Sequence, residues 1–230
     1  MPTEALLLVT AAALIHTAWN ALAKRAGDQV AFLWAAQAIA GVWLAPFALW
    51  RFGIDGLPAA GVPYVVATIV LHALYFYTLG SAYRHGEFSL VYPVARGLGV
   101  AVVPVLAYAA WRERLSLPGA LGIGLVVAGI LALHVTGGAA SLLDRLRASG
   151  AGTGWALATG LVIAVYSVND KVGVSHVYPV IYITLMGFGV TLLLAPVVAR
   201  RRRASGACRR GPPEGTGRCA RGTVCHGRVR

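Results

Sequence analysis

Residues 91–111 read Val-Tyr-Pro-Val-Ala-Arg-Gly-Leu-Gly-Val-Ala-Val-Val-Pro-Val-Leu-Ala-Tyr-Ala-Ala-Trp, an apolar stretch in which Arg96 is the one charged residue. A helix that crosses a membrane needs roughly 20 apolar residues. Backbone N–H and C=O groups in lipid must be satisfied within each segment, which favours helices and excludes open sheets. The stretch therefore predicts an α-helix that spans a bilayer.

Six further segments have the same apolar character. The seven predicted membrane helices occupy residues 4–23, 31–50, 62–83, 91–111, 117–136, 153–171 and 177–199. The short connections between them predict antiparallel neighbours. Residues 1–4 contain no Lys or Arg, so we expect a retained first helix rather than a signal peptide. The predicted fold class is an all-α membrane protein, a polytopic helix bundle with about seven transmembrane helices.

The composition supports a membrane protein. Hydrophobic residues make up 58% of the chain and charged residues 12%, whereas soluble domains carry about 25% charged residues. The net charge of +12 would suggest a nucleic-acid partner, but residues 200–230 hold ten arginines against one glutamate and so supply most of it. We therefore expect no nucleic-acid partner. All three cysteines lie in the same segment, so the apolar body has neither a disulfide framework nor a thiolate metal site.

Polar residues inside membrane helices are costly and are candidates for function. His16, Asn20 and Lys24 are spaced by four and form one stripe of the first helix, with Trp19 beside it. This stripe is expected to face the bundle interior. It could line a substrate cavity, or His16 and Asn20 could bond a neighbouring helix while Lys24 reaches the membrane interface.

His72 and Tyr75 share a face of the third predicted helix. His72 could contact substrate or be a satisfied core histidine. If solvated, either His16 or His72 could titrate near neutral pH and couple proton movement to transport.

Arg96 lies one turn after Tyr92. Its planar guanidinium could bind a carboxylate-bearing substrate. The alternative is a structural pair with Glu87 or Glu113.

The sixth predicted helix carries Tyr166, Asn169 and Asp170 on one face. Asp170 could bind a cation or a proton, or pair with the adjacent Lys171 at the interface. Offsetting the chain by 147 places Trp19 on Tyr166 and Lys24 on Lys171, a sparse internal repeat. A second copy that begins after five helices is inverted in the membrane, as in many transporters.

The predicted helix at 117–136 carries a stripe of small residues, Ala120, Gly124, Ala128 and Ala132. Such stripes let helices approach closely in lipid. We expect internal helix packing, and a homodimer interface is the alternative.

Three stretches together carry a family resemblance. They are residues 14–24 (LIHTAWNALAK), residues 82–97 (AYRHGEFSLVYPVARG), and residues 113–116 (ERLS) continuing into 119–122 and 128–129. The chain resembles an EamA-type transporter of the drug/metabolite transporter superfamily over about residues 5–199. The resemblance implies two inverted five-helix halves around a central cavity, alternating access, export of small metabolites, no cofactor, and a bacterial inner membrane.

On this pattern residues 1–136 form the first five-helix repeat, 137–152 a connecting loop, and 153–199 two helices of a second repeat whose other three are missing. Residues 200–230 stand in their place and are rich in Arg, Gly and Cys. We expect this tail to be disordered or an out-of-frame translation, so that the chain is an incomplete carrier. The alternative is a basic tail that meets anionic lipid. A membrane-embedded enzyme is disfavoured, because no catalytic constellation is present.

Overall fold

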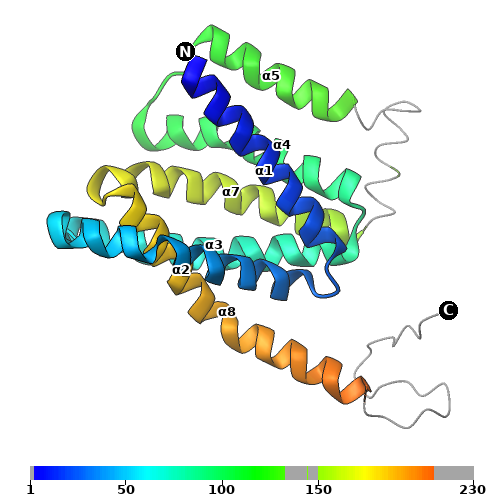
Figure 1. Cartoon of the computed structure of the whole chain (residues 1–230). Coiled ribbons are helices and arrows are strands. Elements are labelled where there is room, and N and C mark those ends of the chain that lie inside the picture. Colours follow the sequence, from blue (N-terminus) through cyan, green and yellow to red (C-terminus); the bar gives the residue numbers. More distant parts are fainter. Residues whose placement is uncertain (1–2, 133–143, 145–149, 210–230) are drawn as a thin grey trace.

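The computed structural model describes residues 3–132, 144 and 150–209, and in these residues all regular secondary structure is helical. The α-helices are α1 (Thr3–Arg25), α2 (Gln29–Asp55), α3 (Val62–His85), α4 (Phe88–Trp111), α5 (Leu117–Ala132), α7 (Ala151–His176) and α8 (Pro179–Arg209), with a short 3₁₀ turn, η1 (Ala59–Gly61), before α3. The predicted all-α class is confirmed, and each of the seven predicted segments contains a helix (Figure 1).

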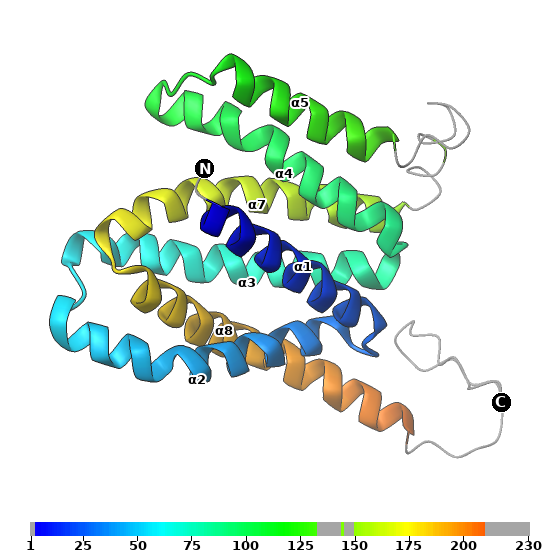
Figure 2. The ribbon, with the colours of Figure 1, turned by 45° about the horizontal axis from the view of Figure 1, so that its top comes forward.

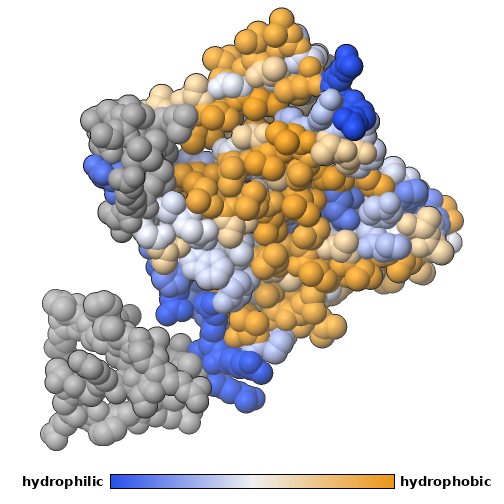
Figure 3. All heavy atoms as spheres, turned by 180° about the vertical axis from the view of Figure 1, so that it is seen from behind, coloured by the Kyte–Doolittle hydropathy of each residue, from blue (hydrophilic) through white to orange (hydrophobic). Residues whose placement is uncertain are grey.

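Six of these helices are long and apolar enough to cross a membrane. The seventh, α5, is described over 16 residues, and residues 133–136 of its predicted segment lie outside the described residues. Large apolar side chains point outward, with Trp43 75% and Leu192 76% exposed. They form an apolar band across the middle of the face in Figure 3, with polar residues towards the ends. A surface of this kind is suited to lipid, and the protein is a multi-span membrane protein.

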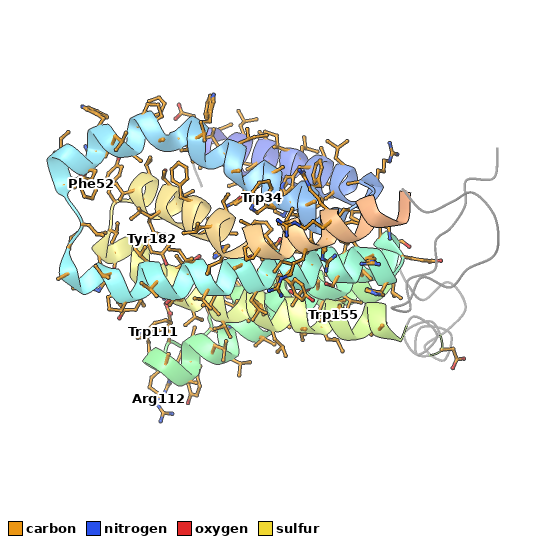
Figure 4. The ribbon with its side chains drawn as sticks, turned by 90° about the horizontal axis from the view of Figure 1, so that it is seen from below. Trp34, Phe52, Trp111, Arg112, Trp155 and Tyr182 are labelled. Atoms are coloured by element: carbon orange, nitrogen blue, oxygen red, sulfur yellow. The ribbon has the colours of Figure 1, made fainter. Side chains whose placement is uncertain are left out.

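Two helices, α3 and α7, form the centre of the bundle. α3 packs against α7, α8 and α2, while α4 covers another side of α7 and carries α5 (Figure 2). α2 also packs along α8, where the Trp34 indole N–H donates to the carbonyl oxygen of Thr191 at 2.7 Å (Figure 4). α1 crosses the outside of the bundle and contacts α2 and α3.

The helix directions agree with an inverted second copy. α1 and α7 cross the bundle in opposite senses, and so do α2 and α8 (Figures 1 and 2). The offset of 147 residues matches α1 with α7, and the inverted repeat stays a prediction.

Local sequence sets the limits of α2. The Asp28 carboxylate accepts from the backbone N–H groups of Val30 and Ala31 and caps the first turn. Gly56, at φ 65°, ends the helix in a conformation that favours glycine. α2 continues past the predicted end at residue 50, where Arg51 pairs with Asp55 one turn later at 2.6 Å and the helix includes both.

α8 continues past the predicted end at residue 199. Its helix includes the four arginines 200–203 and ends at Arg209, so part of the basic segment is helical. Arg201 lies 3.9 Å from the Asp28 carboxylate, which joins this extension to the start of α2. Residues 210–230 lie outside the described residues.

α4 and α7 approach closely because glycines line their contact. A Cβ atom on Gly160 would lie 2.8 Å from the Ala95 carbonyl oxygen, and one on Gly99 would lie 2.6 Å from Ile163 Cγ2. Small residues of this kind allow close helix packing in lipid, where there is no hydrophobic driving force between helices.

The small-residue stripe of α5 does not make such a contact. Ala120, Gly124, Ala128 and Ala132 are all exposed, and a Cβ on Gly124 would meet nothing within 4 Å. The expectation of internal packing is wrong, since α5 turns its opposite face, with Ile130 against Gly97, towards α4. A homodimer interface stays a prediction.

Candidate functional site

Most hydroxyl groups in the bundle are satisfied by their own helix. Those of Thr10, Thr17, Thr159 and Thr191 each donate to the carbonyl four residues earlier. Such groups need no partner on another helix. Several ionisable side chains differ, because they bond between helices, and some of them gather in two neighbouring centres.

The first, the arginine centre, comprises His16 and Trp19 of α1, Tyr75 of α3 and Arg96 of α4. Arg96 Nη2 donates to the Tyr75 hydroxyl oxygen at 2.9 Å and contacts His16 Nε2. The Trp19 indole N–H lies 3.2 Å from His16 Nδ1, with the two rings edge to face. Three predicted candidates from two helices therefore lie around the guanidinium of a fourth, Arg96.

Arg96 forms neither of the structural pairs that were its alternative. Among the described residues no carboxylate lies within 4 Å of it, and Glu113 instead pairs with Lys171 at 2.5 Å. The Arg96 guanidinium lies 5.8 Å from the ring centroids of both Tyr75 and Tyr92. Tyr92 thus belongs to the wall of the arginine centre, where its ring also stacks on Phe88.

The second, the aspartate centre, comprises Thr68 and His72 of α3, Asp170 of α7 and Tyr182 of α8. Asp170 Oδ1 accepts from the hydroxyl groups of Thr68 at 2.7 Å and Tyr182 at 2.8 Å. His72 Nε2 lies 3.8 Å from Asp170 Oδ2. The interfacial pair of Asp170 with Lys171 is not formed, because the Asp170 side chain turns into the bundle.

Tyr166 joins the two centres. Its ring lies 4.3 Å from that of His72 and 5.5 Å from that of Tyr75, between centroids. A continuous polar and aromatic path therefore runs between helices from His16 through Arg96, Tyr75, Tyr166 and His72 to Asp170.

Two residues of the α1 stripe have structural partners instead. Asn20 is fully buried, donates to the His16 carbonyl oxygen and accepts from the Tyr83 hydroxyl of α3. Lys24 Nζ donates to the carbonyl oxygens of Tyr83 and Gly86 at the end of α3. The stripe faces the bundle as predicted, and His16 is the part of it that reaches the arginine centre.

Sequence reasoning missed Thr68 and Tyr182. Thr68 precedes His72 by four residues, so helical spacing could have placed it on the same face. Tyr182 gives no comparable signal, because it reaches Asp170 only through the turn between α7 and α8. Its hydroxyl oxygen also lies 3.2 Å from the Tyr64 carbonyl oxygen.

Neither centre coincides with the cavity of about 290 Å³ at the α7–α8 turn, which is lined by Asp55 and residues 174–179. In the described part of the chain no three His, Cys, Asp or Glu side chains gather as a metal site would require. The arginine centre offers the Arg96 guanidinium with neutral partners. On the other side of Tyr166, the aspartate centre offers the Asp170 carboxylate beside the His72 imidazole.

A fold with six helices long enough to span a membrane, and with partly buried charged side chains between them, is that of a transporter-like membrane protein. The chain is 26% identical over 70 residues to the Multidrug transporter EmrE of Escherichia coli strain K12, a match that covers 30% of this chain and 64% of that protein. The chain thus matches less than two thirds of this relative's length. No family model and no solved structure matches the chain.

Proposed function

We propose that the protein is a carrier that moves small metabolites across a bacterial inner membrane, as an exporter that works by alternating access. The observation that carries the proposal is Arg96, a charge held inside an apolar bundle by residues of two other helices, His16 of α1 and Tyr75 of α3. Ionisable residues inside membrane helices are rare, face the bundle interior and mark substrate or ion pathways.

The path from Arg96 to Asp170 supports the same function. It lies between helices of the two inverted copies, since His16, Tyr75 and Arg96 belong to the first and Tyr166 and Asp170 to the second. Carriers with inverted repeats bind substrate at that boundary, near the middle of the bilayer. The similarity to a multidrug transporter and the EamA-type motifs point to the same class.

The test is flux in proteoliposomes that contain the purified full chain. Radiolabelled small metabolites of negative, zero and positive charge are loaded one at a time, and counterflow is measured. We expect at least one class to exchange faster than in protein-free liposomes, and Arg96→Gln to slow that exchange about tenfold or more, as expected for the loss of a buried charge-assisted bond. Exposed Arg114, changed to Gln, is the matched control. Equal flux with and without protein for every class contradicts the proposal.

A further inference from the structure

His16 has a hydrogen-bond donor at each ring nitrogen. The Trp19 indole N–H points at Nδ1 from 3.2 Å, and an Arg96 N–H points at Nε2. A neutral imidazole has one acceptor nitrogen and one N–H, and a protonated imidazole has two N–H groups. Whichever form His16 takes, at least one of these donors lacks an acceptor, so the arginine centre is short of an acceptor atom.

The arginine centre also lacks negative charge. The partners of Arg96 are His16 and the hydroxyl oxygen of Tyr75, and among described residues no carboxylate lies within 4 Å. The guanidinium has five N–H donors in a planar fork. A buried charge is normally paired, because its desolvation is costly.

Asp170 does not supply the missing charge. It is already bonded to Thr68 and Tyr182, and His72 lies on its other oxygen. The rings of Tyr166 and His72 lie between it and the arginine centre. Because Asp170 repels anions and Arg96 repels cations, an anionic group entering the path is directed to the Arg96 end.

We infer that His16, Trp19 and Arg96 bind the carboxylate group of a small organic acid, with the rings of Tyr75 and Tyr92 against its apolar part. A carboxylate is planar and has only acceptor atoms. Its two oxygens match the guanidinium fork, and they also accept the N–H of Trp19 or Arg96 that finds no acceptor on His16. The two tyrosine rings, each 5.8 Å from the guanidinium, suit an apolar or aromatic body beside the charge. This inference rests on the proposed carrier function and names its substrate class.

The experiment uses the full chain in lipid nanodiscs and three probes that share a phenyl ring: benzoate, benzamide and benzylammonium. Dissociation constants are measured by ligand-observed NMR and by the shift of the thermal midpoint. We expect benzoate to bind at least tenfold more tightly than either other probe. Binding of benzoate no tighter than benzamide overturns the inference, and this comparison needs no variant.

Variants assign the binding to the arginine centre. Arg96→Gln is expected to make benzoate and benzamide bind equally, and Arg96→Lys to keep part of the preference because it keeps charge without the fork. Arg114→Gln is expected to keep all of it. Helical circular dichroism and size-exclusion profiles check that each variant is folded. A benzoate preference that survives in folded Arg96→Gln also overturns the inference.

The two proposals fail in different ways. If a neutral or cationic solute is transported and benzoate is not preferred, the carboxylate site is contradicted and the carrier function is supported. If benzoate is preferred but no solute is transported, the carrier function is contradicted, and the bound acid is then not a transport substrate.

Discussion

Asn20 of α1 and Tyr83 of α3 share a 2.7 Å hydrogen bond at positions where neither residue is exposed at all. The Tyr83 hydroxyl donates to Asn20 Oδ1, while Asn20 Nδ2 donates to the His16 carbonyl oxygen at 2.6 Å. The bond therefore fixes the rotation of α1 about its axis. That rotation is what turns His16 towards Arg96.

Removing one side of this bond leaves the other buried and unsatisfied. We expect Tyr83→Phe to lower the free energy of unfolding by about 1–3 kcal/mol, the usual cost of a buried polar group without a partner. Unfolding by SDS titration from mixed micelles measures it. Tyr108→Phe, at a residue that is 48% exposed, is the control and should change little. Equal stability of the two variants would show that the bond does not hold α1.

The close contact of α4 and α7 predicts that added volume at this contact lowers the stability of the protein. Gly160→Ala places a methyl group 2.8 Å from the Ala95 carbonyl oxygen, so the helices must separate. Overpacking of this kind costs about 1–3 kcal/mol. Gly124→Ala adds the same methyl group where nothing lies within 4 Å, and it should be neutral or slightly stabilising. The same SDS titration compares the two, and a Gly160→Ala protein as stable as Gly124→Ala would contradict the packing described.

The length of each apolar segment predicted the helices and their order, because that length can be counted within the segment itself. The stripe of His16, Asn20 and Lys24 was predicted to face inward for the same reason, since helical spacing is local. Pairing between helices is not local. From the sequence, Arg96 could bind a substrate or form an ion pair with Glu87 or Glu113. Only the packing of the other helices around α4 shows its neutral partners.

The wrong predictions also have physical reasons. Small residues at every fourth position mark a face that can pack closely, but not whether a partner is present, so the outward stripe of α5 was misjudged. Charged Arg51 suggested a break, yet its pairing with Asp55 keeps both residues helical. The roles of the candidate site residues stay predictions.

The aspartate centre predicts a pH-dependent flux. His72 faces Asp170 and Tyr166 of α7, lies beside Thr68 and Tyr75 on its own helix, and meets Tyr182 of α8 through Asp170. If this centre carries a proton during transport, the wild-type exchange rate varies between about pH 5 and pH 8, the range in which histidine responds. His72→Gln and Asp170→Asn should flatten that profile in proteoliposomes. A profile unchanged in both variants rules out proton coupling at this centre.

The pair of Glu113 and Lys171 predicts a small effect. Their side chains are 53% and 55% exposed, and exposed ion pairs contribute less than about 1 kcal/mol. Lys171 also lies 5.0 Å from the Trp111 ring centroid, a contact that Glu113→Gln leaves in place. We therefore expect Glu113→Gln to change the unfolding free energy by less than about 1 kcal/mol. A larger loss would mean that this pair joins the α4–α5 connection to α7 more strongly than exposed pairs do.

The basic residues of the α8 extension predict the orientation. Lys24, Arg25 and Arg84 lie at the same end of the bundle as the arginines 200–203. Loops rich in Lys and Arg stay in the cytoplasm. In a background with the three native cysteines replaced by serine, Ser116→Cys should react with a membrane-impermeant maleimide in intact cells, and Gly27→Cys only after permeabilisation. The reverse pattern would invert the assignment.

α1 is hydrogen-bonded to α3 near its C-terminal end. Its buried residues are Asn20 and Ala23, and its bonds to α3 come from Asn20 and Lys24, whereas Leu7 and Leu8 are 65% and 71% exposed. Thr10 bonds only its own helix. N-terminal to His16, the described part of α1 makes no hydrogen bond to another helix, so this half of α1 is held to the bundle more weakly than the half that carries Asn20 and Lys24.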